Sequence, residues 1–411
     1  MRGSAAFRTG VAPGGALAPG WVKNELWRKA RAVPSLDLRF ADNKSLVDAT
    51  TGASLVTFTR ASSGTFVGSD GVLRSATTDE PRFDHNPTTG ESLGLLVEEQ
   101  RTNLLLRSEE FDNVAWALFG TASRTANTTV APNGTTTADS VTLPVSSGIL
   151  QFGSGSANTA YTFSIWIRCD TIQSVRLVIN TNLGDPTTLT VTATSSWQRF
   201  SITKTTSVGT LAVTSQVDTG GGNTFYLWGA QLEVGAFATS YIPTTTAAAT
   251  RSADVASITG TAFSSWYRQD EGTVFSEAKG ITVFDENTRR YWEISSGSSA
   301  NRLLSGYGNS TQTRFFVVRD GIPSANIVSF NQNLNLYTKS ISTFGNNYYR
   351  IFSNGISGQT DNSGNLPSGL MNSLSLGTQF GVDVTTLNGT IKRFTYWPVR
   401  LDDPTLQSTT Q

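Results

Sequence analysis

The chain has 411 residues, of which 38% are hydrophobic and only 15% are charged. Its 31 basic and 31 acidic residues balance, so no global field attracts nucleic acid or an anionic membrane. The single cysteine, Cys169, excludes an intrachain disulfide, and no apolar run is long enough for a membrane span. Abundant threonine, glycine and aromatic residues favour an all-β fold.

The first 35 residues predict an extended basic N-terminal arm. Residues 1–20 are rich in glycine, alanine and proline and cannot build a core. Residues 21–30 fit one short helix, which Pro34 ends. Basic residues and tryptophans lie together here, so we expect the arm to bind an acidic protein surface rather than nucleic acid. The side chains expected to anchor it are Trp21, Trp27, Arg28, Lys29 and Arg31.

Residues 36–106 predict a β-rich connector of short strands and turns. Residues 82–90 read Arg-Phe-Asp-His-Asn-Pro-Thr-Thr-Gly, which contains two turn-forming pairs. Residues 94–105 read Gly-Leu-Leu-Val-Glu-Glu-Gln-Arg-Thr-Asn-Leu-Leu, a buried strand followed by a polar cluster. There, Arg101 and Asn103 offer donors to neighbouring backbone. The two segments resemble a segment of tailed-bacteriophage virion proteins that lies just ahead of their β-sandwich domains.

Residues 107–245 predict a first antiparallel sandwich or jelly roll, because short strands recur between turn signals. Residues 161–168 alternate over eight positions. Four apolar side chains of this strand are therefore expected to face the core, and Trp166 and Arg168 to face the other way.

Several stretches of this first sandwich resemble non-catalytic carbohydrate-binding modules of the jelly-roll type. They are residues 131–139, the strand around Trp166, residues 197–199 and residues 228–233. The closing Thr-Ser-Tyr-Ile-Pro-Thr at residues 239–244 resembles the end of this domain in phage proteins.

Residues 251–403 predict a second sandwich after a threonine- and alanine-rich linker, and residues 404–411 a short tail. The alternating strands at residues 272–278 and 387–397 resemble the early and closing strands of concanavalin A-like (laminin G-type) domains. Between them the resemblance is looser. The predicted fold is thus all-β, with two antiparallel β-sandwich (jelly-roll) domains in tandem after an arm and a connector.

The sequence predicts no catalytic or metal-binding residues. His85 is the one histidine, which excludes histidine-based zinc sites and leaves catalytic triads only this residue. Acidic residues occur as adjacent pairs, such as Glu98 and Glu99, which point to opposite sides of a strand. Calcium could use Asp361, Asn362 or Asp383, as in some laminin G-type domains, but these fit ordinary turns. We expect no cofactor.

Sugar recognition needs a flat aromatic face beside polar hydrogen-bonding groups. Trp166 with Arg168 fits that pattern, and Trp292 is a second candidate. For each, the alternative is packing against a neighbouring domain or subunit. Trp197, Trp228 and Trp397 are expected in the core.

The resemblances imply a structural component of a tailed-phage virion, such as a fibre, spike or decoration protein, made in the host cytoplasm. Its arm would bind other virion proteins of the capsid, neck or tail. Its sandwiches would adhere weakly to host-surface glycans through many copies of a homo-oligomer, without nucleic acid or membrane insertion. The alternatives are a purely architectural role without ligand and a polysaccharide depolymerase.

Overall fold

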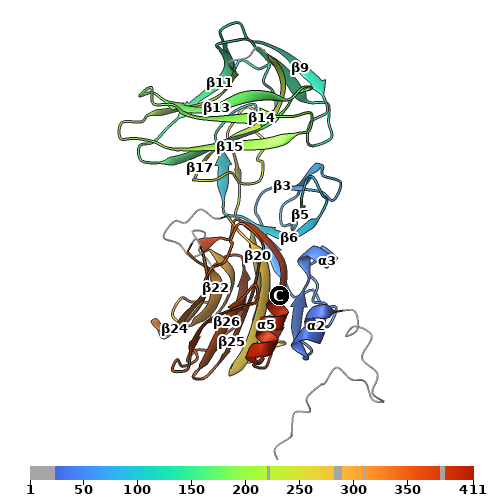
Figure 1. Cartoon of the computed structure of the whole chain (residues 1–411), viewed down its shortest axis with the longest axis vertical. Helices are drawn as coiled ribbons and strands as arrows, with labels where there is room; N and C mark the ends of the chain where they lie inside the picture. The colour runs from blue at the N-terminus through green and yellow to red at the C-terminus, as the bar shows by residue number, and fades with distance from the viewer. Residues whose placement is uncertain (1–23, 220–222, 282–288, 310, 380–384) are drawn as a thin grey trace, which may run out of the picture.

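The structure is a computed structural model of the whole chain, and it describes residues 24–219, 223–281, 289–309, 311–379 and 385–411. Figure 1 shows two β-sandwiches, one above the other, with a smaller β-rich region between them. Strands predominate, and the strand pairs among the described residues are antiparallel, which confirms the predicted all-β sandwich class. No helix in the described ranges is both long and apolar enough to cross a membrane.

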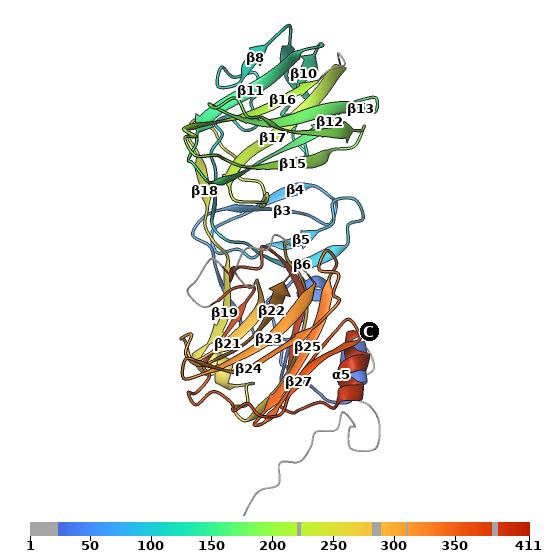
Figure 2. The ribbon, with the colours of Figure 1, turned by 60° about the vertical axis from the view of Figure 1, so that its left-hand side comes forward.

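The first sandwich consists of two five-stranded sheets (Figures 1 and 2). The β12 sheet has the order β15 (Gln198–Thr205), β12 (Ala160–Arg168), β17 (Asn223–Val234), β10 (Ala138–Leu143) and β9 (Ser123–Thr129). The β13 sheet has the order β14 (Thr187–Ala193), β13 (Gln173–Thr181), β16 (Ala212–Thr219), β11 (Ser147–Ser154) and β8 (Ala117–Phe119). Phe163, Ile165 and Ile167 are fully buried between the sheets, as their alternation predicts.

The second sandwich has larger sheets. The β20 sheet has the order β27 (Ile356–Asp361), β26 (Tyr348–Ser353), β25 (Thr338–Gly345), β20 (Glu271–Lys279), β29 (Gly389–Trp397), β6 (Ser92–Val97) and β5 (Phe83–His85), and β1 (Leu36–Leu38) also pairs with β29. The β21 sheet has the order β2 (Thr57–Thr59), β19 (Val255–Thr259), β28 (Ser373–Leu376), β21 (Arg290–Ser295), β22 (Arg302–Asn309), β23 (Gln312–Arg319) and β24 (Ile322–Ser329).

Residues 36–106 are not the separate connector that we predicted, because β1, β2, β5 and β6 complete the second sandwich. Leu36, Leu95 and Val97 lie fully buried in its core. Gly94 has a φ of 89°, and a Cβ there would collide with the carbonyl oxygen of Ile391 on β29. The segment at residues 94–105 therefore needs glycine at this position. The hairpin of β3 (Gly64–Val67) and β4 (Leu73–Ala76) and the pair of β7 (Arg101–Asn103) with β18 (Ala249–Arg251) lie between the sandwiches.

The N-terminal region also differs from the prediction. Residues 24–35 are not an extended arm, because α2 (Glu25–Ala30) packs with α5 (Asp403–Thr410) on the outer face of the β20 sheet. Leu26 and Ala30 of α2 are buried there against Trp397 and Leu406. The predicted tail therefore contains a helix. The remaining short helices are α3 (Phe40–Asn43) and α4 (Gly260–Ser264).

Trp292 corrects another expectation. The sequence makes it a candidate for sugar recognition or for packing against a neighbouring domain or subunit, but it is 1% exposed and lies in the core of the second sandwich. Its ring centroid is 6.1 Å from that of Phe315 and 6.2 Å from that of Phe394 on the opposite sheet. The sequence misleads here because every residue of β21 is buried, so alternation along this strand does not separate buried from exposed positions.

Trp292→Ala is expected to lower the free energy of unfolding by about 3–5 kcal/mol, because it opens a large cavity in the core. Urea unfolding followed by tryptophan fluorescence and circular dichroism measures this change. A loss below about 1 kcal/mol, the range of surface substitutions, would contradict the assignment of Trp292 to the core.

Candidate functional site

A buried network of charged side chains joins the two sandwiches. Arg60, Arg82, Glu98, Arg251 and Asp254 are each at most 5% exposed. Arg82 Nη2 lies 2.8 Å from Glu98 Oε2 and also pairs with the Asp254 carboxylate. Arg60 Nη1 lies 3.2 Å from Asp254 Oδ1. Arg82 and Asp254 are 172 residues apart in the sequence, so the network can form only when both segments have reached their final positions.

Glu98 connects this network to the closing segment of the first sandwich. Its carboxylate accepts hydrogen bonds from Ser240 N at 2.7 Å and from Ser240 Oγ at 2.6 Å. Burial raises the pKa of Glu98, but Arg251, Arg82 and the Ser240 hydrogen bonds outweigh burial and lower the pKa to about 2. Glu98 is therefore a carboxylate at neutral pH and holds residue 240 beside the arginines of the junction.

Asn103, near the end of the segment at residues 94–105, donates to neighbouring backbone of the first sandwich, as the sequence predicts. Its Nδ2 donates to the carbonyl oxygens of Ala230 at 3.0 Å and Ile242 at 2.9 Å. Its Oδ1 accepts from the backbone N–H of Leu232 at 3.1 Å. One side chain thus fixes two segments that end the first sandwich.

Glu99 makes the corresponding link to the second sandwich. Asn388 Nδ2 donates to Glu99 Oε2 at 2.7 Å, and Asn388 Oδ1 accepts from Glu99 N at 2.8 Å. Arg101 pairs with the Glu99 carboxylate rather than with backbone, and its guanidinium lies 4.6 Å from the ring centroid of Phe237. The motif at residues 82–103 therefore links both sandwiches.

Trp166 lies on the outer face of the β12 sheet, as its alternation predicts, but this face is covered. Its ring centroid is 5.5 Å from that of Trp228 and 5.4 Å from that of Tyr241, and the Arg199 guanidinium lies 4.5 Å from its centroid. Leu73 of the β3–β4 hairpin packs against the same cluster. Trp166 is thus half-buried at the junction, and its ring is in contact with side chains of its own chain.

Arg168 points away from the core but has partners of its own. It donates from Nη2 to Asp170 Oδ1 at 3.0 Å, and its guanidinium lies 4.9 Å from the ring centroid of Tyr226. It does not form the expected site with Trp166. Of the tryptophans predicted in cores, Trp228 and Trp397 are buried, whereas Trp197 is half-buried and donates to the Val130 carbonyl oxygen at 2.9 Å.

The predicted anchoring residues divide into two groups. Trp27 is 7% exposed and donates from Nε1 to Asp37 Oδ2 at 2.9 Å within its own chain, so it is not free to bind a partner. Arg28 and Arg31 are exposed, and Lys29 pairs with Glu25 at 3.2 Å. Trp21 lies outside the described residues.

The outer face of the β13 sheet combines an exposed aromatic ring with polar groups. Phe152 on β11 is 69% exposed, and its neighbour across the sheet is Thr214. On another row of the same face, Arg176 of β13 binds Asp218 of β16 through Nε–Oδ1 at 2.7 Å and Nη2–Oδ2 at 3.1 Å. Gln216 also donates to Asp218. This face therefore carries what a sugar site needs, a ring for stacking and fixed hydrogen-bonding groups.

We did not identify this face from the sequence. Leu150 and Phe152 alternate with Ile149 and Gln151, so both sides of β11 carry an apolar residue. Such a strand resembles one buried on both faces. The pairing of β11 with β16, whose outward side chains are polar, would have indicated that Phe152 faces outward. Phe152 and its partner Thr214 are, however, more than 60 residues apart in the sequence.

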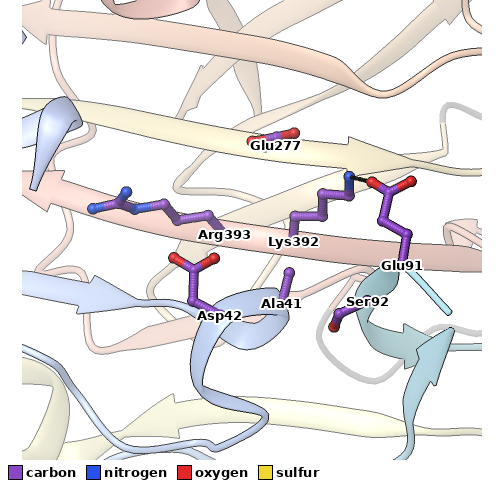
Figure 3. A pocket seen from close by; sticks show the side chains of 7 residues that line it. All are labelled: Ala41, Asp42, Glu91, Ser92, Glu277, Lys392 and Arg393. Carbon is purple, nitrogen blue, oxygen red and sulfur yellow. Dashed lines mark hydrogen bonds and ion pairs between the residues drawn. The ribbon is translucent and has the colours of Figure 1, made fainter. Parts of the chain in front are cut away.

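A polar cleft of about 380 Å³ lies on the β20 sheet beside α3. Figure 3 shows Glu91 beside Lys392 of β29, and Glu277 on the neighbouring strand β20. Lys392 Nζ lies 2.6 Å from Glu91 Oε1, and this contact lowers the pKa of Glu91. A general acid in glycoside hydrolysis needs a raised pKa, and no aromatic residue lines the cleft. Glu91 therefore does not fit the role of general acid, and the cleft offers no ring for sugar stacking.

Calcium gains no support from the loops proposed for it. Asp361 Oδ1 accepts from Ser363 N at 2.8 Å, the geometry of an ordinary turn, and Asp383 lies outside the described residues. Where the structure describes the chain, no group of three or more His, Cys, Asp or Glu is placed to hold a metal ion.

Comparisons with known proteins give structural similarities that each cover about a third of the chain. No family model matches, and no curated protein matches. The CBM40 module of the Ruminococcus gnavus IT-sialidase, bound to α2,3-sialyllactose, is 17% identical with a TM-score of 0.30 and covers 34% of this chain and 83% of that chain. The NanB sialidase of Streptococcus pneumoniae is 14% identical with a TM-score of 0.30 and covers 37% of this chain and 26% of that chain.

A phage protein is also similar. The enzymatically active domain of tailspike protein 4 of bacteriophage CBA120 is 12% identical with a TM-score of 0.25 and covers 32% of this chain and 21% of that chain. Similarities this low assign neither a function nor a ligand to this chain.

Acid is expected to weaken the junction. The folded-state pKa of Glu98, about 2, lies below its ordinary value of 4.5. The stabilisation is therefore complete above pH 4.5 and is lost as the pH falls from 4.5 towards 2. Urea unfolding at a series of pH values should show the free energy of unfolding falling across this range.

Glu98→Gln isolates this effect. It leaves Arg82 and Arg251 without one carboxylate, so the free energy of unfolding at pH 7 should fall by about 3–5 kcal/mol and depend less on pH below 4.5. Glu91→Gln is the matched control, because Glu91 forms an exposed ion pair worth less than about 1 kcal/mol. Equal effects of the two substitutions would contradict the role of Glu98.

Proposed function

We propose that the chain is a non-catalytic adhesion protein of a tailed-phage particle, which binds host-surface glycans through the outer face of the β13 sheet. The observation that carries the glycan part is Phe152, which is 69% exposed within a sheet face of polar side chains. Exposing a large aromatic side chain on a folded sheet costs hydrophobic free energy, and stacking against a sugar ring would recover it.

Polar groups elsewhere on the same sheet face support a sugar rather than a protein partner. The bidentate Arg176–Asp218 pair holds both side chains in fixed orientations, and Arg176 keeps a side-chain exposure of 52%. Thr190, which is exposed on the adjacent strand β14, lies directly opposite Arg176 of β13. Fixed donors and acceptors on the same face as an exposed ring suit the hydroxyl groups of a saccharide that lies along the face.

The virion part rests on the resemblance of residues 82–105 and 239–244 to phage proteins. The junction supports it, because these two segments meet in the buried network through Glu98 and Ser240. A rigid junction suits a protein that projects sandwiches from a particle. Mass spectrometry of purified particles from a phage that encodes this chain tests this part, and absence of the chain from the particles would overturn it.

Phe152→Ala is expected to weaken glycan binding by about tenfold while changing the free energy of unfolding by less than about 0.5 kcal/mol. Binding of the labelled full-length chain to an array of bacterial polysaccharides measures the first effect, and urea unfolding the second. Phe330→Ala is the matched control, since Phe330 is 40% exposed on the second sandwich. Equal binding by the wild type and Phe152→Ala would refute the assignment of this face.

The purified protein is expected to release no reducing ends from the polysaccharides that it binds. In the cleft of Figure 3, Lys392 lowers the pKa of Glu91, whereas a general acid needs a raised pKa. A reducing-sugar assay measures release over hours. Release that disappears in Glu277→Gln would establish the alternative, a polysaccharide depolymerase.

A further inference from the structure

Three arginines lie together on the outer face of the β21 sheet, in the second sandwich. Arg290, Arg302 and Arg314 come from the adjacent strands β21, β22 and β23, which Figure 2 shows side by side. Arg290 and Arg314 both pair with Gly306, one on each side of it. A Cβ on Gly306 would collide with the carbonyl oxygen of Arg289. Glycine at position 306 therefore leaves the sheet surface between the two arginines without a side chain.

The arginine cluster has few negative partners. Glu293 is the one carboxylate that pairs with these arginines in the described part of the chain, through Arg290 and through Arg302 Nη1 at 3.8 Å. Arg314 donates from Nε to the neutral Asn326 Oδ1 at 2.8 Å. Two of the three guanidinium groups thus share one carboxylate, and Arg314 pairs with none in the described part of the chain. At the junction, by contrast, two carboxylates serve three arginines.

Burial makes this imbalance costly. Arg290 is 5% exposed, and neither its Nε nor that of Arg302 has a hydrogen-bond partner among the described residues. Burial, and then the neighbouring Arg302 and Arg314, lower the pKa of Arg290 to about 9. Burial likewise lowers the pKa of Arg302 and of Arg314. A bound anion would stabilise all three guanidinium groups.

The cluster is open to a ligand at its rim. Arg302 and Arg314 are half-buried, and Asn326 is exposed. The Arg314 guanidinium lies 4.1 Å from the ring centroid of Phe316, which is half-buried on the same face. Stacking on the ring fixes the orientation of the planar guanidinium, and a guanidinium held in this way suits the two oxygens of a sugar carboxylate.

We propose that the outer face of the β21 sheet binds the carboxylate of an acidic saccharide through Arg290, Arg302 and Arg314, with Phe316 holding the Arg314 guanidinium in place. Nucleic acid fits this face less well, because tracking a phosphate backbone needs an extended basic groove and the chain as a whole has no net charge. The site lies on a different sandwich from Phe152 and goes beyond the proposed function.

Calorimetric titration of the full-length chain tests this site. The probes are oligogalacturonate and oligosialic acid, their carboxyl-reduced forms, and inorganic phosphate. At least one acidic oligosaccharide should bind, and its carboxyl-reduced form should not. Arg302→Gln and Arg314→Gln should each weaken binding by about tenfold or more. These half-buried residues are chosen instead of Arg290, because replacing the buried Arg290 risks unfolding the chain.

Two controls make the result specific. Arg319→Gln removes a guanidinium that is 43% exposed on the same strand β23 and should leave affinity unchanged. Phe152→Ala should also leave it unchanged, so failure of this site and failure of the first are distinguishable. Binding of phosphate without either saccharide, equal binding of the carboxyl-reduced forms, or unchanged affinity in Arg302→Gln would each overturn the proposal.

Discussion

The arrangement of the molecule depends on burying the charges of Arg82, Glu98 and Asp254 between the two sandwiches. Removing such groups from water is expensive, and their mutual attraction offsets this cost only when geometry and hydrogen bonds are nearly complete. Here Glu98 accepts two hydrogen bonds from Ser240 in addition to its ion pairs. A displaced sandwich would leave buried charges without partners. The network therefore favours one relative position of the sandwiches over others.

This constraint decides which sheet faces are available. The outer face of the β12 sheet is covered at the junction by Tyr241 and the β3–β4 hairpin. The outer face of the β20 sheet is covered by α2 and α5. In each sandwich, other segments of the same chain thus cover one of the two outer faces. The remaining faces, on the β13 and β21 sheets, carry the two sites proposed above, each with half-buried or exposed side chains of a kind that suits saccharides.

The sequence predicts the parts of this arrangement that depend on local pattern. Alternation at residues 161–168 correctly separates core side chains from Trp166, and turn chemistry with strand-forming residues correctly gives an all-β fold. The sequence does not reveal what covers an outward face. Trp166 meets Tyr241, 75 residues away, and β6 pairs with β29 nearly 300 residues later. Such contacts follow from tertiary packing, which alternation does not encode.

The buried charges of the junction hold both sandwiches in one relative position, and the distance between the sandwiches tests this most directly. Spin labels on Ser201→Cys of β15 and Thr57→Cys of β2, both exposed positions, report that distance by double electron–electron resonance. Cys169 is 1% exposed and should remain unlabelled. The account predicts a single narrow distance distribution at pH 7. A broad or multiple distribution would contradict it.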